Sequence, residues 1–197
     1  MQRTRLLPEE RKKEIRKAAA RKFLEKGFSA TTMEDVIAES GLSVGGVYHY
    51  YKSTGDILYD IMEEANKSRI EKTLHRYQQG NYSTPEDMAA QFITEKIIDE
   101  NLYKPLYAMF LLEKSRDPKL QRLFEKLSID GLQEMLDAFG KTQNACGIKL
   151  LDSFLFTFMN ALTIGFEYLG EKKLFKMKKQ AITEMVKAYL VYKNNEE

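Results

Sequence analysis

The sequence predicts an all-α protein of about nine helices, and three features carry this prediction. Apolar residues recur at spacings of three and four along most of the 197 residues, and no segment shows sustained alternation of apolar and polar residues between turn dipeptides. The four prolines also stand where helices are expected to begin: Pro8, Pro85, Pro105 and Pro118.

The first helix is expected from Pro8 to Lys26. Acidic residues fill its first turn, apolar residues share one face, and Gly27 is placed to end it. The preceding arm, Met1 to Leu7, carries Arg3 and Arg5, and arms of this kind can enter a DNA minor groove. Disorder of a chain terminus explains the same composition equally simply.

A helix-turn-helix is expected between Thr32 and Tyr50. Thr32 is a suitable N-cap, and Asp35 stands three residues later, where it can complete a capping box. Gly41 can end this helix in the left-handed conformation, and Ser43 can cap a second helix from Val44 to Tyr50. Two short helices joined by three residues have the spacing of this motif.

The second short helix has an unusual composition. Gly45 and Gly46 lie in its first turn, where each costs roughly 1 kcal/mol relative to alanine. Such a loss indicates a surface that another molecule approaches closely, and a helix start free of bulky side chains suits a phosphate backbone. We expect Val47 and Tyr51 in the core, and Lys52 on the exposed side together with Tyr48 and Tyr50.

The segment TTMEDVIAESGLSVGGVYHYYKSTGDIL resembles the DNA-binding domain of the TetR family of bacterial transcriptional repressors. The resemblance is specific over Phe28 to Leu58. It implies phosphate contacts from Thr31, Thr32, Ser43, Tyr48, Tyr50 and Lys52, and base contacts from Val44, Gly45, Gly46 and His49. Ile37 stands where the family commonly has a small residue, and Thr54 where it commonly has a basic one.

A long helix from Thr54 to Gln79 is expected to follow this motif. At about 1.5 Å per residue it spans nearly 40 Å and can link two domains. Further helices are expected over 86–99, 105–115 and 118–139, the last bent or split at Gly131. We therefore expect a DNA-binding domain over 1–53 and an effector-binding and dimerisation domain over 54–197.

Aromatic and methionine residues are dense in the second domain and can line an apolar cavity. The layout of the family combined with this density suggests an effector site lined by Phe92, Tyr107, Phe110, Phe154 and Phe158. An ordinary helical core is the competing interpretation for each of them.

The last helices suggest self-association, since the helix around Phe158 is apolar on more than one side and needs covering on each. Two such helices from each chain would form a four-helix interface, the usual arrangement of TetR-like proteins. The expected interface residues are Leu151, Leu155, Phe158, Leu162, Phe166, Ile182, Met185 and Tyr189. Burial within one chain is the alternative.

Composition argues against several other classes of protein. Residues 1–55 hold 11 Lys and Arg against 7 Asp and Glu, whereas residues 56–197 hold 20 against 22, so the basic excess lies with the motif. One cysteine, Cys146, fits a reducing cytoplasm, and the longest uncharged apolar run, Ser153–Phe166, is 14 residues, too short for a bilayer span. Without nucleotide-binding, hydrolase or metal-ligand motifs, we expect no enzyme, cofactor or metal.

These observations favour a cytoplasmic, homodimeric repressor that binds a double-stranded DNA operator and is released by a small apolar or amphipathic effector. A protein-interaction module that keeps the helix-turn-helix fold is the alternative from another class. A constitutive architectural DNA binder is a third, and the large apolar second domain disfavours it.

Overall fold

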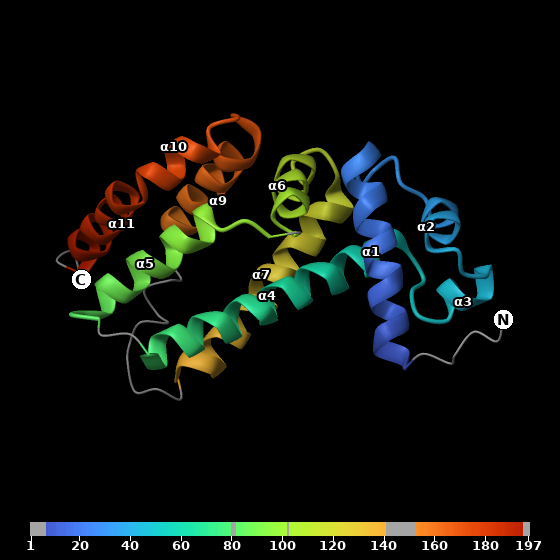
Figure 1. The fold of residues 1–197 in the computed structure, drawn as a ribbon, viewed down its shortest axis with the longest axis horizontal. Coiled ribbons are helices and arrows are strands. Elements are labelled where there is room, and N and C mark those ends of the chain that lie inside the picture. Colours follow the sequence, from blue (N-terminus) through green and yellow to red (C-terminus); the bar gives the residue numbers. More distant parts are fainter. Residues whose placement is uncertain (1–6, 80–81, 102, 141–152, 195–197) are drawn as a thin grey trace. The chain divides into compact units, whose positions relative to one another are not determined.

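The computed structural model describes residues 7–79, 82–101, 103–140 and 153–194, and within these ranges the chain forms ten helices and no strand (Figure 1). This confirms the predicted all-α class. The helices are α1 (Pro8–Lys26), α2 (Met33–Ser40), α3 (Val44–Tyr48), α4 (Thr54–Gln79), α5 (Pro85–Ile98), α6 (Lys104–Glu113), α7 (Pro118–Gly140), α9 (Ser153–Tyr168), α10 (Lys172–Met177) and α11 (Lys179–Asn194). The arm with Arg3 and Arg5 lies outside the described residues.

Three helices differ from the expectation. α3 ends at Tyr48 rather than Tyr50, because the Tyr50 amide donates to the Val47 carbonyl in a tighter turn. α7 continues through Gly131, where a Cβ would lie 2.9 Å from Nδ2 of Asn66, so glycine here permits close approach of α4 rather than a bend. The short helix α10 was not predicted from the sequence.

By contacts the chain divides into two compact units, each made of two segments. Unit 1 comprises Met1–Ala65 and Pro105–Leu127, and unit 2 comprises Asn66–Lys104 and Ser128–Glu197. Helix α4 therefore begins in unit 1 and ends in unit 2. The expected boundary after residue 53 separates a DNA-binding domain from an effector-binding domain. It is defined by function and not by compactness, and it stays a prediction.

The interior of unit 1 is built from α1, α2, α3 and the first half of α4. The side chains predicted to share one face of α1 are all fully buried, and so are apolar residues from the other three helices. These residues are Ile15, Ala18, Ala19, Phe23, Val36, Val47, Ile57, Leu58 and Ile61.

A polar cluster joins α1, the segment after α3 and α4 within this interior. The Arg16 guanidinium lies 2.9 Å from the Asp60 carboxylate and 2.8 Å from that of Glu64, and the Tyr51 hydroxyl donates to Asp60. Burial acts to raise the pKa of Asp60, but hydrogen bonds from Tyr51 and Arg16 outweigh it and hold that pKa below its ordinary value. The cluster thus fixes Tyr51, just past the end of α3, onto two long helices.

The core of unit 2 lies among α5, α9 and α11. α5 packs against both of the others, and its apolar face contributes Met88, Ala90, Ile93 and Ile97 to the core. At one buried point the Thr183 hydroxyl donates to that of Thr94, 3.0 Å away. No helix in the described ranges combines the length and the apolar character needed to cross a bilayer.

We predict that unit 1 loses stability in acid through Asp60. Because its folded pKa is lowered, its contribution is complete above about pH 4, the ordinary aspartate value, and is lost as the pH falls through the lower folded value. Urea unfolding of the wild type between pH 5 and pH 2 should show this loss, and Asp60→Asn should flatten it.

The exposed Asp137 supplies the matched control, and Asp137→Asn should leave the pH dependence unchanged. Tyr51→Phe keeps the ring and removes only the hydroxyl, so it should cost about 1.5–3 kcal/mol at pH 7, the value typical of a hydrogen bond to a charged group. Equal acid sensitivity of the wild type and Asp60→Asn would contradict this account.

Candidate nucleic-acid interface

The start of α2 is fixed by the predicted capping box. The Thr32 amide donates to the Asp35 carboxylate at 2.7 Å, and the Asp35 amide donates to the Thr32 hydroxyl oxygen at 3.3 Å. A hydrogen bond from the Lys26 side chain, at 2.5 Å, and those from Thr32 lower the pKa of Asp35 to about 2. Gly41 ends the helix at φ +63°, as predicted.

Ion pairs hold α2 against α1. The Arg21 guanidinium lies 2.6 Å from the Glu39 carboxylate, and the Lys22 ammonium lies 3.5 Å from it. Lys26 and Asp35 form a further ion pair near the start of α2, so α2 is paired with α1 near both of its ends. Such pairs contribute little to stability individually because they are exposed, but they favour one orientation of α2 on α1.

α3 presents an open surface on one side and a buried anchor on the other. The Ser43 hydroxyl oxygen accepts from the Gly46 amide at 3.1 Å, which confirms the predicted N-cap, and Val47 is fully buried. A Cβ at Gly45 would meet no atom within 4 Å, and Val44 is 60% exposed. The first turn of α3 is therefore accessible to a large partner.

The residues after α3 turn back onto it. The Lys52 ammonium donates to the Tyr48 carbonyl at 2.8 Å, and the amides of Lys52 and Ser53 donate to the Asp56 carboxylate at 3.0 and 2.9 Å. The His49 ring meets the Tyr50 ring edge-on, with centroids 4.8 Å apart. Lys52 and His49 are exposed, and the tyrosines are half-buried.

Most of the predicted DNA-contacting residues therefore gather on α3 and its flanks with exposed or half-buried side chains, and Thr32 is exposed at the start of α2. Thr31 is different. It is 6% exposed, and its hydroxyl donates to the Gly27 carbonyl at 2.7 Å. Its side chain stabilises the loop between α1 and α2, so we leave it out of the interface proposed below.

The residues expected to line an effector cavity are divided between the two units, and the cavity stays a prediction. Phe110 is fully buried in unit 1 beside Phe124, with ring centroids 5.9 Å apart, whereas Phe154 in unit 2 is 60% exposed. Phe92 and Phe158 border the core of unit 2, and Tyr107 is half-buried in unit 1.

The expected dimer residues separate into a buried and an accessible group. Leu155, Phe166 and Ile182 are at most 8% exposed within the protomer, and the dimer interface stays a prediction. Met185 is 59% exposed, while Phe158, Leu162 and Tyr189 pack at the edge of the core. Leu151 lies outside the described residues.

Sequence reasoning did not identify two features that position this interface. Tyr51 was assigned to the core, but its polar partners Arg16 and Asp60 were not identified. They lie 35 and 9 residues from Tyr51 in the sequence, and neither separation follows from the periodicity of one helix. Glu113 of α6 was also missed, although it contacts the loop before α2. An 84-residue separation leaves no signal in a single sequence.

Comparisons with known proteins point to the same segment. The family described as "Bacterial regulatory proteins, tetR family" matches residues 15–61. The uncharacterized HTH-type transcriptional regulator YfiR of Bacillus subtilis strain 168 is 49% identical over 55 residues, which is 28% of this chain and 27% of that protein. The HTH-type transcriptional repressor KstR2 of Mycolicibacterium smegmatis is 32% identical over 72 residues, covering 36% and 33%. These alignments span less than half of either relative.

The fold extends the likeness to almost the whole chain. The transcriptional regulator FadR of Bacillus subtilis, solved in complex with stearoyl-CoA, superimposes with a TM-score of 0.62 at 16% identity over 88% of this chain and 96% of that one. At this identity the comparison speaks for the fold alone. Residues 15–61 are thus similar to the DNA-binding segment of the TetR family of bacterial regulatory proteins, and nearly the whole chain has the fold of a solved transcriptional regulator.

Proposed function

We propose that this chain is a cytoplasmic, homodimeric transcriptional repressor that binds a pseudo-palindromic DNA operator through α3 and is released by a small amphipathic effector. The observation that carries the proposal is the geometry of α3. Its first turn is open and rich in glycine, and buried Val47 and Tyr51 fix its other side to the protein. An open first turn of this kind can enter a DNA groove and come close to the DNA.

The exposed chemistry of α3 suggests how DNA is read. Val44, Gly45 and Gly46 offer no side-chain donors to base edges, so we propose that Val44 contacts a thymine methyl group. Ser43, Tyr48, Tyr50 and Lys52 supply phosphate contacts. Specificity then depends strongly on DNA shape as well as on base contacts.

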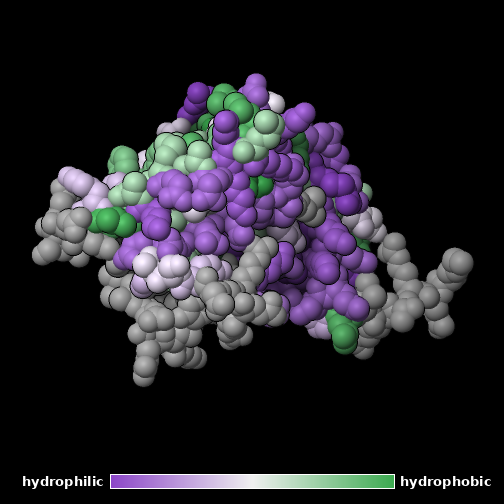
Figure 2. All heavy atoms as spheres, turned by 60° about the vertical axis from the view of Figure 1, so that its left-hand side comes forward, coloured by the Kyte–Doolittle hydropathy of each residue, from purple (hydrophilic) through white to green (hydrophobic). Residues whose placement is uncertain are grey.

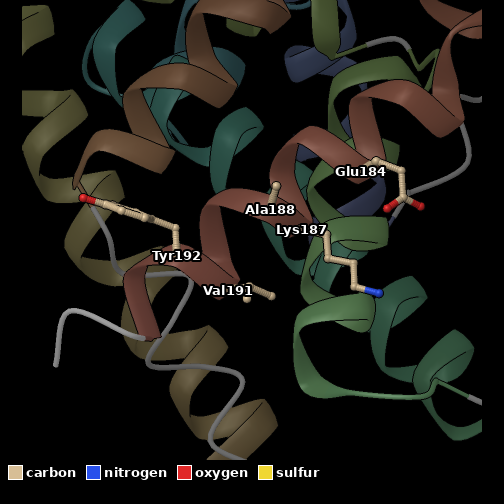
Figure 3. Close-up of a pocket in the computed structure, with 5 residues that line it drawn as sticks. All are labelled: Glu184, Lys187, Ala188, Val191 and Tyr192. Carbon is tan, nitrogen blue, oxygen red and sulfur yellow. The ribbon is translucent and has the colours of Figure 1, made fainter.

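An exposed apolar stripe on α9 and α11 supports the homodimer. On α11 the exposed side chains Ala181, Met185, Ala188 and Tyr192 recur at spacings of four, three and four, and α9 adds Phe154, which is 60% exposed. Figure 3 shows a shallow pocket along α11 that is lined by Glu184, Lys187, Ala188, Val191 and Tyr192. We propose that it receives a side chain of a second copy.

The surface of the molecule mixes hydrophobic and hydrophilic side chains. On the face drawn in Figure 2, hydrophobic side chains are exposed in patches between hydrophilic ones. Pairing α9 and α11 with their copies would cover the outer side of α9, whose inner side packs against α5. A four-helix interface thus satisfies both apolar sides of α9.

Lys96, beside the ring of Phe156, supports an amphipathic effector in unit 2. The Lys96 ammonium lies 5.5 Å from the centroid of the Phe156 ring. Burial is the main cause that lowers the pKa of Lys96 well below its ordinary value, and the positive charges of Arg69 and Lys104 act in the same direction. We propose that these two neighbouring charges favour an anion beside Lys96. The FadR relative was solved with stearoyl-CoA, a ligand with an anionic head and an apolar chain.

We predict that Lys52→Ala weakens binding to operator and random DNA by the same factor, because a phosphate contact carries no sequence information. The slope of log affinity against log salt should fall by about 1 in magnitude. An electrophoretic mobility shift assay with DNA from upstream of the protein's own gene measures the affinity and the salt slope. Lys119→Ala is the control, because Lys119 is an exposed residue of α7. A loss confined to the operator would refute this role, and weak, salt-sensitive binding by the wild type would favour the interaction-module alternative.

We predict that Met185→Glu converts the dimer into a monomer at micromolar concentration. In a dimer, the new glutamate would bury a charge at the centre of the apolar stripe on α11. Sedimentation velocity measures this. Ile129→Glu provides the matched control, because Ile129 is 67% exposed on α7 and lies outside the stripe. If Met185→Glu sediments as the wild type does, the stripe is not the interface.

We predict that a long-chain acyl-CoA such as stearoyl-CoA releases the operator, and that Lys96→Met weakens this release at least tenfold while leaving DNA affinity unchanged. The measurement is a titration of the protein–DNA complex followed by fluorescence anisotropy. Lys173→Met, an exposed lysine of α10, is the control. Equal potency of the acyl-CoA against the wild type and Lys96→Met would rule out an anionic head group at Lys96.

A further inference from the structure

The carboxylate of Glu113, at the end of α6, holds the loop between α1 and α2. It accepts hydrogen bonds from the backbone amides of Phe28 and Ser29 and from the Ser29 hydroxyl, each at 3.3 Å. All of these residues lie in unit 1. One side chain therefore makes three contacts with a loop that lies more than 80 residues earlier in the sequence.

Gly27 makes room for this carboxylate. Its φ is +84°, a conformation that side chains rarely adopt, and a Cβ added there would lie 3.0 Å from Oε1 of Glu113. The glycine that ends α1 thus has a second role, because it lets the carboxylate approach the backbone closely. The fit between α6 and this loop is tight.

The loop that Glu113 holds sets the start of α2. Only Ala30 and Thr31 separate Ser29 from the N-cap Thr32, and the Thr31 hydroxyl is bonded to the Gly27 carbonyl. Little freedom remains between the Glu113 contacts and the first turn of α2. Since α3 follows α2 after three residues, the direction of α3 depends on this loop.

α6 is itself restrained within unit 1. Its side chains Leu106, Ala108 and Phe110 are fully buried there. Directly after its end, the Lys114 ammonium lies 3.9 Å from the centroid of the Phe124 ring on α7. A helix anchored in this way can impose a position on the loop rather than follow it.

We infer that Glu113 is a positioning residue of the DNA-binding unit: its carboxylate fixes the α1–α2 loop and, through that loop, the orientation of α2 and α3. This inference rests on the proposed function, since positioning has a consequence only if α3 reads DNA. Glu113 itself touches no DNA. Its effect is to reduce the number of orientations from which α3 enters the groove.

Glu113→Ala tests the inference. It should lower operator affinity at least tenfold and lower random-DNA affinity by less, so that the ratio of the two falls, while the salt slope stays unchanged because no phosphate contact is lost. Glu125→Ala is the control, as Glu125 is exposed on α7 in the same unit and accepts only from Gln121 among the described hydrogen bonds.

A double-mutant cycle with Ser29→Ala separates positioning from general destabilisation. Ser29→Ala alone removes one of the three contacts and should cause a smaller loss of specificity, and in the Glu113→Ala background it should cause no further loss. A structural role without positioning would lower the unfolding free energy and leave the operator-to-random ratio unchanged. That result would overturn the inference.

Amide hydrogen exchange provides a readout that does not involve DNA. Exchange at residues 28–36 should be faster in Glu113→Ala than in the wild type, whereas exchange in α5 and α11 should not change. If the wild type binds no DNA although exchange accelerates as expected, the proposed function fails while the contact stands. If exchange is unaltered, Glu113 does not hold the loop and the inference itself fails.

Discussion

The structure depends on a constraint imposed by α3, which is too short and too rich in glycine to hold its own shape. A helix of five residues with two glycines has no intrinsic stability, because nucleation alone is unfavourable and each glycine adds to the cost. The rest of unit 1 supplies what it lacks. Val47 anchors one side in the core, Tyr51 is tied to Asp60 and Arg16, and the Ser43 cap fixes the first turn.

The polar cluster around Tyr51 also explains why the first half of α4 belongs to unit 1. Asp60 and Glu64 lie on α4, and both pair with Arg16 of α1, so the first half of α4 is bound to the helices that carry α3. Breaking a buried cluster by removing one partner is costly. Displacement of α4 would therefore carry α3 with it rather than leave it behind.

Local chemistry allowed much of unit 1 to be predicted from the sequence, whereas the contacts that orient it could not be. Thr32, Asp35, Gly41 and Ser43 act on neighbours within four residues, and the structure confirms their caps. Leu155 was assigned to an interface because periodicity identifies an apolar face without saying what covers it, and within the protomer Leu155 packs in the core that α5 shares. Contacts such as that of Glu113 with Ser29 leave no local pattern.

The central claim is that two copies of α3 are held at a fixed separation and read DNA from one side. Hydroxyl-radical footprinting of the purified chain on DNA from upstream of its own gene tests this most directly. The account predicts two protected patches on one face of the duplex, one helical turn or about 34–36 Å apart. A single protected patch, or protection that follows no sequence and disappears at moderate salt, would contradict it.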